Sequence, residues 1–226
     1  MSSHLSSHHH HHTALAHHFD SLDQQREAST FGMWVFLVTE IMFFGGLFTA
    51  YVVYRLQYPV AFAAASNSLL TWAGSVNTVV LICSSLTMAM AVRSAQVDKK
   101  KAIVLFLLLT IFLGAVFLGI KAYEYRTEWV EHHYPGVHFQ FEGPDPQHAE
   151  MFFSIYFCMT GLHALHMIIG MSILGVLLVQ SWKGRFSSQY HNPLECMGLY
   201  WHFVDIVWIF LLPLLYLFGA NLHHGG

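Results

Sequence analysis

Residues 102–121 read AIVLFLLLTIFLGAVFLGIK, a run with no charged side chain before its last residue. At about 1.5 Å per residue, a helix of this length crosses the ~30 Å hydrocarbon core of a bilayer. The run shows no alternation of polar and apolar residues, so a helix is favoured over a membrane-spanning strand. We therefore expect a transmembrane helix here.

Four further apolar runs have the same character and lie at 31–54, 69–92, 151–180 and 197–219. Hydrophobic residues make up 55% of the 226 residues and charged residues only 10%. A soluble domain carries roughly 25% charged residues, and the five runs leave no room for one here. The sequence predicts an all-α integral membrane bundle of five transmembrane helices, with one domain at 31–219.

Two short tails flank this domain. Residues 1–30 are rich in His and Ser and include a run of five histidines from His8 to His12. We interpret this segment as a disordered or tag-like tail rather than a folded unit, although His-rich tracts can also bind metal. Residues 220–226 form a second short tail. Neither segment contributes to the predicted fold.

The basic residues predict how the bundle lies in the membrane. Seven of the ten Lys and Arg residues fall on one side of the five runs. Because positive loops stay in the cytoplasm, the N-terminus is predicted to be cytoplasmic and the C-terminus outside. The outer connection at 125–150 is acidic and contains Pro-Gly and Gly-Pro steps, so we expect turns there and no further helix. The seven are Arg26, Arg93, Lys99, Lys100, Lys101, Lys183 and Arg185.

Ionisable residues inside the runs are the candidate functional groups, because each costs several kcal/mol in lipid unless it is paired or neutral. Glu40 lies near the middle of the first run. One interpretation is a proton-exchanging or lipid-facing acid. The other is a neutral carboxyl that is hydrogen-bonded to a neighbouring helix. The sequence leaves both open.

Two pairs of polar residues occur at helical spacing in the last two runs. His163 and His166 share a helix face, as do His202 and Asp205. We expect hydrogen bonds between helices and no metal site, because no third ligand is suitably spaced. Asp205 is expected to pair with His202 or with the other two histidines, forming a polar knot in the bundle.

The remaining candidates lie near the ends of the runs. Glu124 follows Lys121 by three residues at an interfacial position, and His191 and Glu195 share a face before the last run. We assign these residues to a structural polar network and predict no catalytic residue. The three cysteines have no C-x-x-C spacing, and nothing basic enough for nucleic-acid binding is present.

Five of these segments together resemble subunit III of the haem-copper oxidases. The matching stretches cover nearly all of 31–219, and the last two are long and occur in the family's order. They are Glu40-Ile41-Met42-Phe43-Phe44; Asn77-Thr78; Ala122-Tyr123-Glu124-Tyr125; Thr160-Gly161-Leu162-His163-Ala164-Leu165-His166-Met167-Ile168-Ile169-Gly170; and His191 and Glu195 followed by Tyr200-Trp201-His202-Phe203-Val204-Asp205-Ile206-Val207-Trp208.

The resemblance implies a non-catalytic subunit of a proton-pumping terminal oxidase in a bacterial inner (plasma) membrane. It implies that haem and copper lie in partner subunits, that this chain binds phospholipids, and that subunit I is a direct partner. Subunit II and a small subunit IV complete the expected complex. Glu40 matches the family's carbodiimide-reactive glutamate. Longer members have seven helices, and this chain begins where their third would lie.

The electron donor of the complex is left open. Glu40 favours cytochrome c, because quinol-type sequences tend to place Asp there, but a quinol oxidase is the nearest alternative. A subunit associated with nitric oxide reductase is a third possibility. From a different class, the chain could be a stand-alone proton carrier or transporter that uses its intramembrane acids and histidines.

Overall fold

The computed structural model describes residues 21–137, 139–186 and 190–217. These residues form α1 (Leu22–Gln57), α2 (Pro59–Ser68), α3 (Thr71–Gln96), α4 (Lys100–Val130), α5 (Pro146–Trp182) and α6 (Asn192–Leu212). A single π-helical turn, η1 (Pro213–Leu217), follows α6 directly. Residues 1–20 and 220–226 of the two predicted tails lie outside the described residues. The expected tail was wrong for residues 22–30, because they form the first turns of α1.

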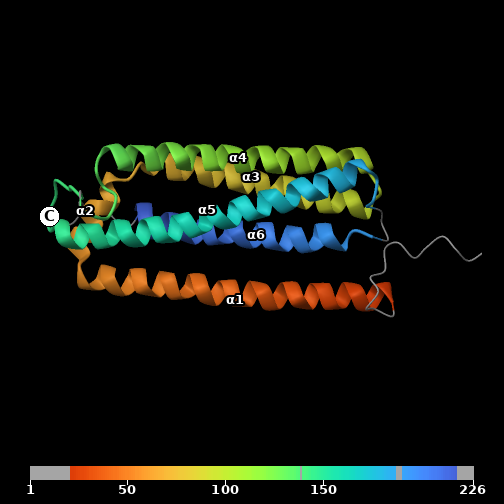
Figure 1. Cartoon of the computed structure of the whole chain (residues 1–226), viewed down its shortest axis with the longest axis horizontal. Helices are drawn as coiled ribbons and strands as arrows, with labels where there is room; N and C mark the ends of the chain where they lie inside the picture. The colour runs from red at the N-terminus through yellow and green to blue at the C-terminus, as the bar shows by residue number, and fades with distance from the viewer. Residues whose placement is uncertain (1–20, 138, 187–189, 218–226) are drawn as a thin grey trace, which may run out of the picture.

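Five of these helices are long and apolar enough to cross a membrane: α1, α3, α4, α5, and α6 with η1. The prediction of an all-α bundle with five transmembrane helices is confirmed. The chain is therefore a multi-pass membrane protein. In Figure 1 the five long helices lie side by side, and the short α2 lies at the end of the bundle that holds the α4–α5 loop.

The predicted loop at 125–150 is shorter in the structure. Helix α4 continues to Val130, and α5 begins at Pro146. The expectation of turns throughout this segment was wrong at both ends. Polar residues beyond Lys121 do not end α4, because the side chains on its inner face are buried against other helices and find partners there. Pro146 suits a helix start, where the missing N–H is not needed.

The sequence did not reveal α2 as a separate element. Pro59 occupies its first turn, and Ala61, Phe62, Ala65 and Ser66 are buried. The Ser66 hydroxyl donates a hydrogen bond to the carbonyl of Leu215 at 2.6 Å. Helix α2 therefore closes one end of the bundle over η1.

Helix α6 forms the centre of the bundle and α1 lies at its edge. Trp201 and Trp208 of α6 are fully buried and donate hydrogen bonds to α3, at 3.0 Å to Ser84 Oγ and 3.1 Å to Thr78 Oγ1. Much of α1 is exposed, with Met42 at 73%. Figure 1 shows α1 running along one side of the other helices.

The contact between α5 and α6 requires a small residue at position 170. A Cβ atom built on Gly170 would lie 3.0 Å from Tyr200 Cε1 and 3.1 Å from Trp201 Cζ3. Gly175, on the same helix, has no such neighbour within 4 Å. Small residues allow this kind of close approach between membrane helices.

We predict that Gly170→Leu destabilises the protein by about 1–3 kcal/mol, because the added side chain overpacks the α5–α6 contact. Gly175→Leu is the matched control and should remain within about 0.5 kcal/mol of the parent. Thermal unfolding of the purified chain in detergent, followed by near-UV circular dichroism, measures both. An equal decrease in the unfolding temperature of the two variants would show that the α5–α6 contact does not limit stability.

Candidate functional site

Glu40 and His166 form a hydrogen-bonded pair between α1 and α5. The distance from Glu40 Oε2 to His166 Nε2 is 3.1 Å. The Glu40 side chain is 19% exposed and the His166 side chain 14%. The hydroxyl of Tyr200 on α6 donates to the His166 carbonyl at 3.0 Å, so three helices meet at this pair. The predicted mid-membrane acid is therefore bonded to a neighbouring helix.

The other nitrogen of His166 decides how protons are arranged in this pair. Nδ1 lies 2.8 Å from the Leu162 carbonyl oxygen, which can only accept, so Nδ1 carries a hydrogen. In a neutral imidazole, Nε2 must then accept from a protonated Glu40. The alternative is an ion pair of imidazolium and carboxylate. In both cases one exchangeable proton is shared between Glu40 and His166.

His163 does not take part in this pair, although it is only one turn away. Its ring is buried between Phe117 of α4 and Trp208 of α6, with ring centroids 5.4 Å and 5.3 Å away. Among the described residues, neither of its nitrogens has a hydrogen-bond partner. The two histidines thus face different neighbours, and His163 does not make the predicted hydrogen bond between helices.

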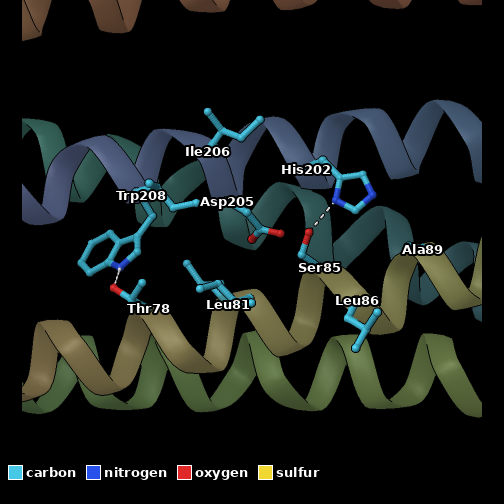
Figure 2. Close-up of a pocket in the computed structure, with 11 residues that line it drawn as sticks. Thr78, Leu81, Ser85, Leu86, Ala89, His202, Asp205, Ile206 and Trp208 are labelled. Carbon is cyan, nitrogen blue, oxygen red and sulfur yellow. Dashed lines mark hydrogen bonds between the residues drawn. The ribbon is translucent and has the colours of Figure 1, made fainter.

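Asp205 lies in an open groove of about 430 Å³ between α3 and α6 (Figure 2). Its side chain points toward Ser85, but within the described part of the chain neither carboxyl oxygen makes a hydrogen bond of good geometry. Ser85 Oγ instead lies 2.6 Å from His202 Nδ1. The predicted knot between Asp205 and the histidines was therefore wrong. His202 bonds to Ser85 on the facing helix α3 instead.

A fully connected polar network surrounds Glu124. Lys121 Nζ donates to Glu124 Oε2 at 3.1 Å, to Tyr156 Oη at 3.2 Å and to Tyr216 Oη at 2.9 Å. Both tyrosine hydroxyls donate to Glu124 Oε1. The predicted Lys121–Glu124 pair is present. Both charged side chains are buried, and their partners come from the protein.

Glu195 joins three helices at the opposite end of the bundle. It contacts His191 Nε2 at 3.1 Å, as the spacing of the two residues predicted. It also accepts from Arg26 of α1 and from Gln96 of α3, each at 3.1 Å. These contacts place the start of α1, the end of α3 and the start of α6 together.

One cluster of possible metal ligands was not predicted from the sequence. Glu128, Glu131 and His133 place one potential ligand atom each within 4.8 Å of one another, where α4 ends. The signal was present as a Glu-His-His sequence at 131–133. The prediction of a loop at 125–150 does not bring Glu128 close to this sequence, whereas the helix that continues to Val130 does.

The sequence of this chain is similar to those of known oxidase subunits. A family model described as cytochrome c oxidase subunit III matches residues 11–220. The chain belongs to that family. Cytochrome bo(3) ubiquinol oxidase subunit 3 of Pseudomonas aeruginosa is 30% identical over 217 residues, covering 96% of this chain and 97% of the relative. Cytochrome c oxidase subunit 3 of Thermostichus vulcanus is 31% identical over 206 residues, covering 91% and 94%.

Membership in the subunit III family confirms the resemblance found in the sequence, and it implies assembly with other oxidase subunits. The relative from Formosania lacustris, a cytochrome c oxidase subunit 3, is 31% identical, and this chain covers 69% of its length. The five-helix chain thus matches some relatives over nearly their whole length and others over part of it.

We predict that Glu40→Gln leaves stability within about 0.5 kcal/mol of the parent, whereas Glu40→Leu loses about 1 kcal/mol. The Gln amide can still donate to His166 Nε2, and Leu cannot. Thermal unfolding in detergent separates the two variants. Equal destabilisation by Gln and Leu would instead identify a charged pair, because Gln would leave an imidazolium without its counter-ion.

We predict that Lys121→Met destabilises the bundle by about 3–5 kcal/mol, since it leaves the Glu124 carboxylate buried without its cation. The double variant Lys121→Met with Glu124→Gln should recover most of this loss, because the two tyrosines can still donate to the amide oxygen. Unfolding midpoints of the parent, single and double variants provide the measurement. A single variant as stable as the parent would contradict this account of the network.

Proposed function

We propose that this chain is subunit III of a bacterial proton-pumping cytochrome c oxidase, and that it acts without a redox centre of its own. Under this proposal it lies in the inner membrane with its N-terminus in the cytoplasm. It supports assembly and proton uptake by subunit I and holds phospholipid, while haem and copper belong to the partner subunits. Subunit II and a small subunit IV complete the complex.

The groove around Asp205 carries the proposal that the chain works as part of a larger assembly. Asp205 is only 5% exposed, and both of its carboxyl oxygens are buried by its own chain. The groove is rimmed by exposed apolar side chains, including Ile82, Leu86 and Ile206. Lipid tails offer no hydrogen-bond donor, so a buried carboxyl without a partner is costly there. A donor from a helix of subunit I would satisfy it.

The Glu40–His166 pair supports a role in proton handling or lipid contact. Helix α1 is exposed before and after Glu40, with Val38 at 52% and Met42 at 73%. This apolar surface is suited to phospholipid tails, and it lies next to a carboxyl whose proton is shared with an imidazole. The same position matches the carbodiimide-reactive glutamate of the family.

Cytochrome c is the proposed electron donor of the complex, with quinol as the alternative. Glu40 supports the cytochrome c type, whereas the relative from Pseudomonas aeruginosa is a ubiquinol oxidase subunit. A role beside nitric oxide reductase is a further alternative. A stand-alone proton carrier belongs to a different class, and it requires proton flux through the chain without any partner.

We predict that affinity purification of this chain from membranes in mild detergent recovers a haem-containing partner, and that Asp205→Leu weakens this recovery. An interhelical hydrogen bond in a membrane contributes about 1–2 kcal/mol, so roughly a five- to thirtyfold weaker association is expected. Haem absorbance per mole of chain is the readout. Glu40→Gln is the control and should retain the partner, because Glu40 lies on a different helix.

Two results would overturn the proposal. One is the absence of haem absorbance from the purified parent. The other is proton flux in liposomes that contain the isolated chain, which would identify a stand-alone carrier. Oxygen consumption by the purified complex with reduced cytochrome c and, separately, with a quinol distinguishes the two donors.

A further inference from the structure

The end of α4 folds back on itself at 131–133. The N–H of His133 donates to the Glu128 carbonyl at 3.0 Å, and that of His132 donates to the Trp129 carbonyl at 3.3 Å. These two bonds define a Schellman turn. His132 occupies the left-handed position with φ of 58°, where glycine is usual. The turn brings the ring of His133 back over the last turn of the helix, next to Glu128.

The three side chains converge at distances that suit a metal ion. His133 Nδ1 lies 2.8 Å from Glu128 Oε2 and 3.4 Å from Glu131 Oε2. Ligand atoms of a tetrahedral zinc ion lie about 3.3–3.5 Å apart, because each is about 2.0–2.1 Å from the metal. Only small side-chain adjustments would therefore place an ion between these atoms.

Glu128 provides an independent sign that this group can bind a cation. The residue is fully buried, and its Oε1 has no hydrogen-bond partner in the part of the chain that the structure describes. The buried cation of the same helix, Lys121, directs its three hydrogens to Glu124 and two tyrosines. Two carboxylates at the end of α4 thus share a single imidazole. A divalent ion would neutralise both.

The surroundings hold the imidazole in place and leave the group open to water. The His133 ring stacks on Phe153 of α5 with centroids 4.9 Å apart and meets the edge of Phe141 at 5.7 Å. The Glu131 side chain is 50% exposed, so an ion can enter from solvent and keep a water ligand. The C-terminal end of α4 also carries the negative end of the helix dipole, which favours a cation.

We propose that Glu128, Glu131 and His133 form a binding site for a divalent transition-metal ion, with Zn²⁺ the best match. One imidazole and two carboxylates are typical zinc ligands, whereas Ca²⁺ and Mg²⁺ prefer oxygen ligands in larger number. The ion replaces the proton held between His133 and Glu128, so binding releases a proton. The ion also links His133 in the turn after α4 to Glu128 within the helix, which stabilises the turn. The site is separate from Glu40 and does not depend on the proposed function.

The test is a Co²⁺ and Zn²⁺ titration of the purified full-length chain. His8 to His12 are replaced by serine in every sample, because that tract can bind metal by itself. We expect one saturable site per chain, seen as a visible Co²⁺ absorption band and as heat released with Zn²⁺. Glu128→Gln, Glu131→Gln and His133→Asn should each weaken binding at least about tenfold. Glu142→Gln, a loop carboxylate outside the group, is the control and should bind as the parent does.

The experiment remains decisive if Glu128→Gln fails to fold, because Glu131 is half exposed and Glu131→Gln leaves the buried residues in place. Zn²⁺ should also raise the unfolding temperature of the parent and have no effect on that of His133→Asn. No saturable binding in the parent would overturn the proposal. Binding that survives both Glu131→Gln and His133→Asn would do the same.

Discussion

The structure depends on one constraint: no water is available inside the membrane, so a buried polar group must find its partner within the protein. The Lys121–Glu124 network meets this demand completely. A buried ion pair alone costs about as much in desolvation as it gains in attraction, but Tyr156 and Tyr216 supply the further hydrogen bonds that both charges need. Helices α4 and α5 and the turn η1 are fixed to one another at this point.

The same constraint applies to two buried carboxyl groups whose hydrogen bonding is incomplete among the described residues. Asp205 lines a groove that is rimmed by exposed apolar side chains, and Glu128 belongs to a cluster of possible metal ligands at the end of α4. Both carboxyls are buried, and both lack a partner among the described residues for at least one oxygen. The first sits where another membrane helix can supply a donor, and the second where a cation can enter from water. Their different surroundings therefore point to different ligands.

Glu40 represents an intermediate case. It has a partner, His166, and yet it remains partly exposed beside the apolar surface of α1. Because the Leu162 carbonyl fixes the hydrogen on Nδ1 of His166, the hydrogen bond between Glu40 and His166 depends on the one proton that lies between Nε2 and the carboxyl. That property distinguishes it from the Lys121–Glu124 network, in which every hydrogen is committed to structure.

The sequence alone determined the five membrane helices, the helical class and the family, because hydrophobic length and ordered motifs are local properties of the chain. It also predicted pairs one turn apart, such as Lys121 with Glu124. Only the tertiary structure decided which residues meet across helices: His166 with Glu40, His163 with two aromatic rings, and His202 with Ser85. These contacts depend on how each helix is rotated and shifted against its neighbours. That arrangement comes from packing over the whole bundle, which no single segment encodes.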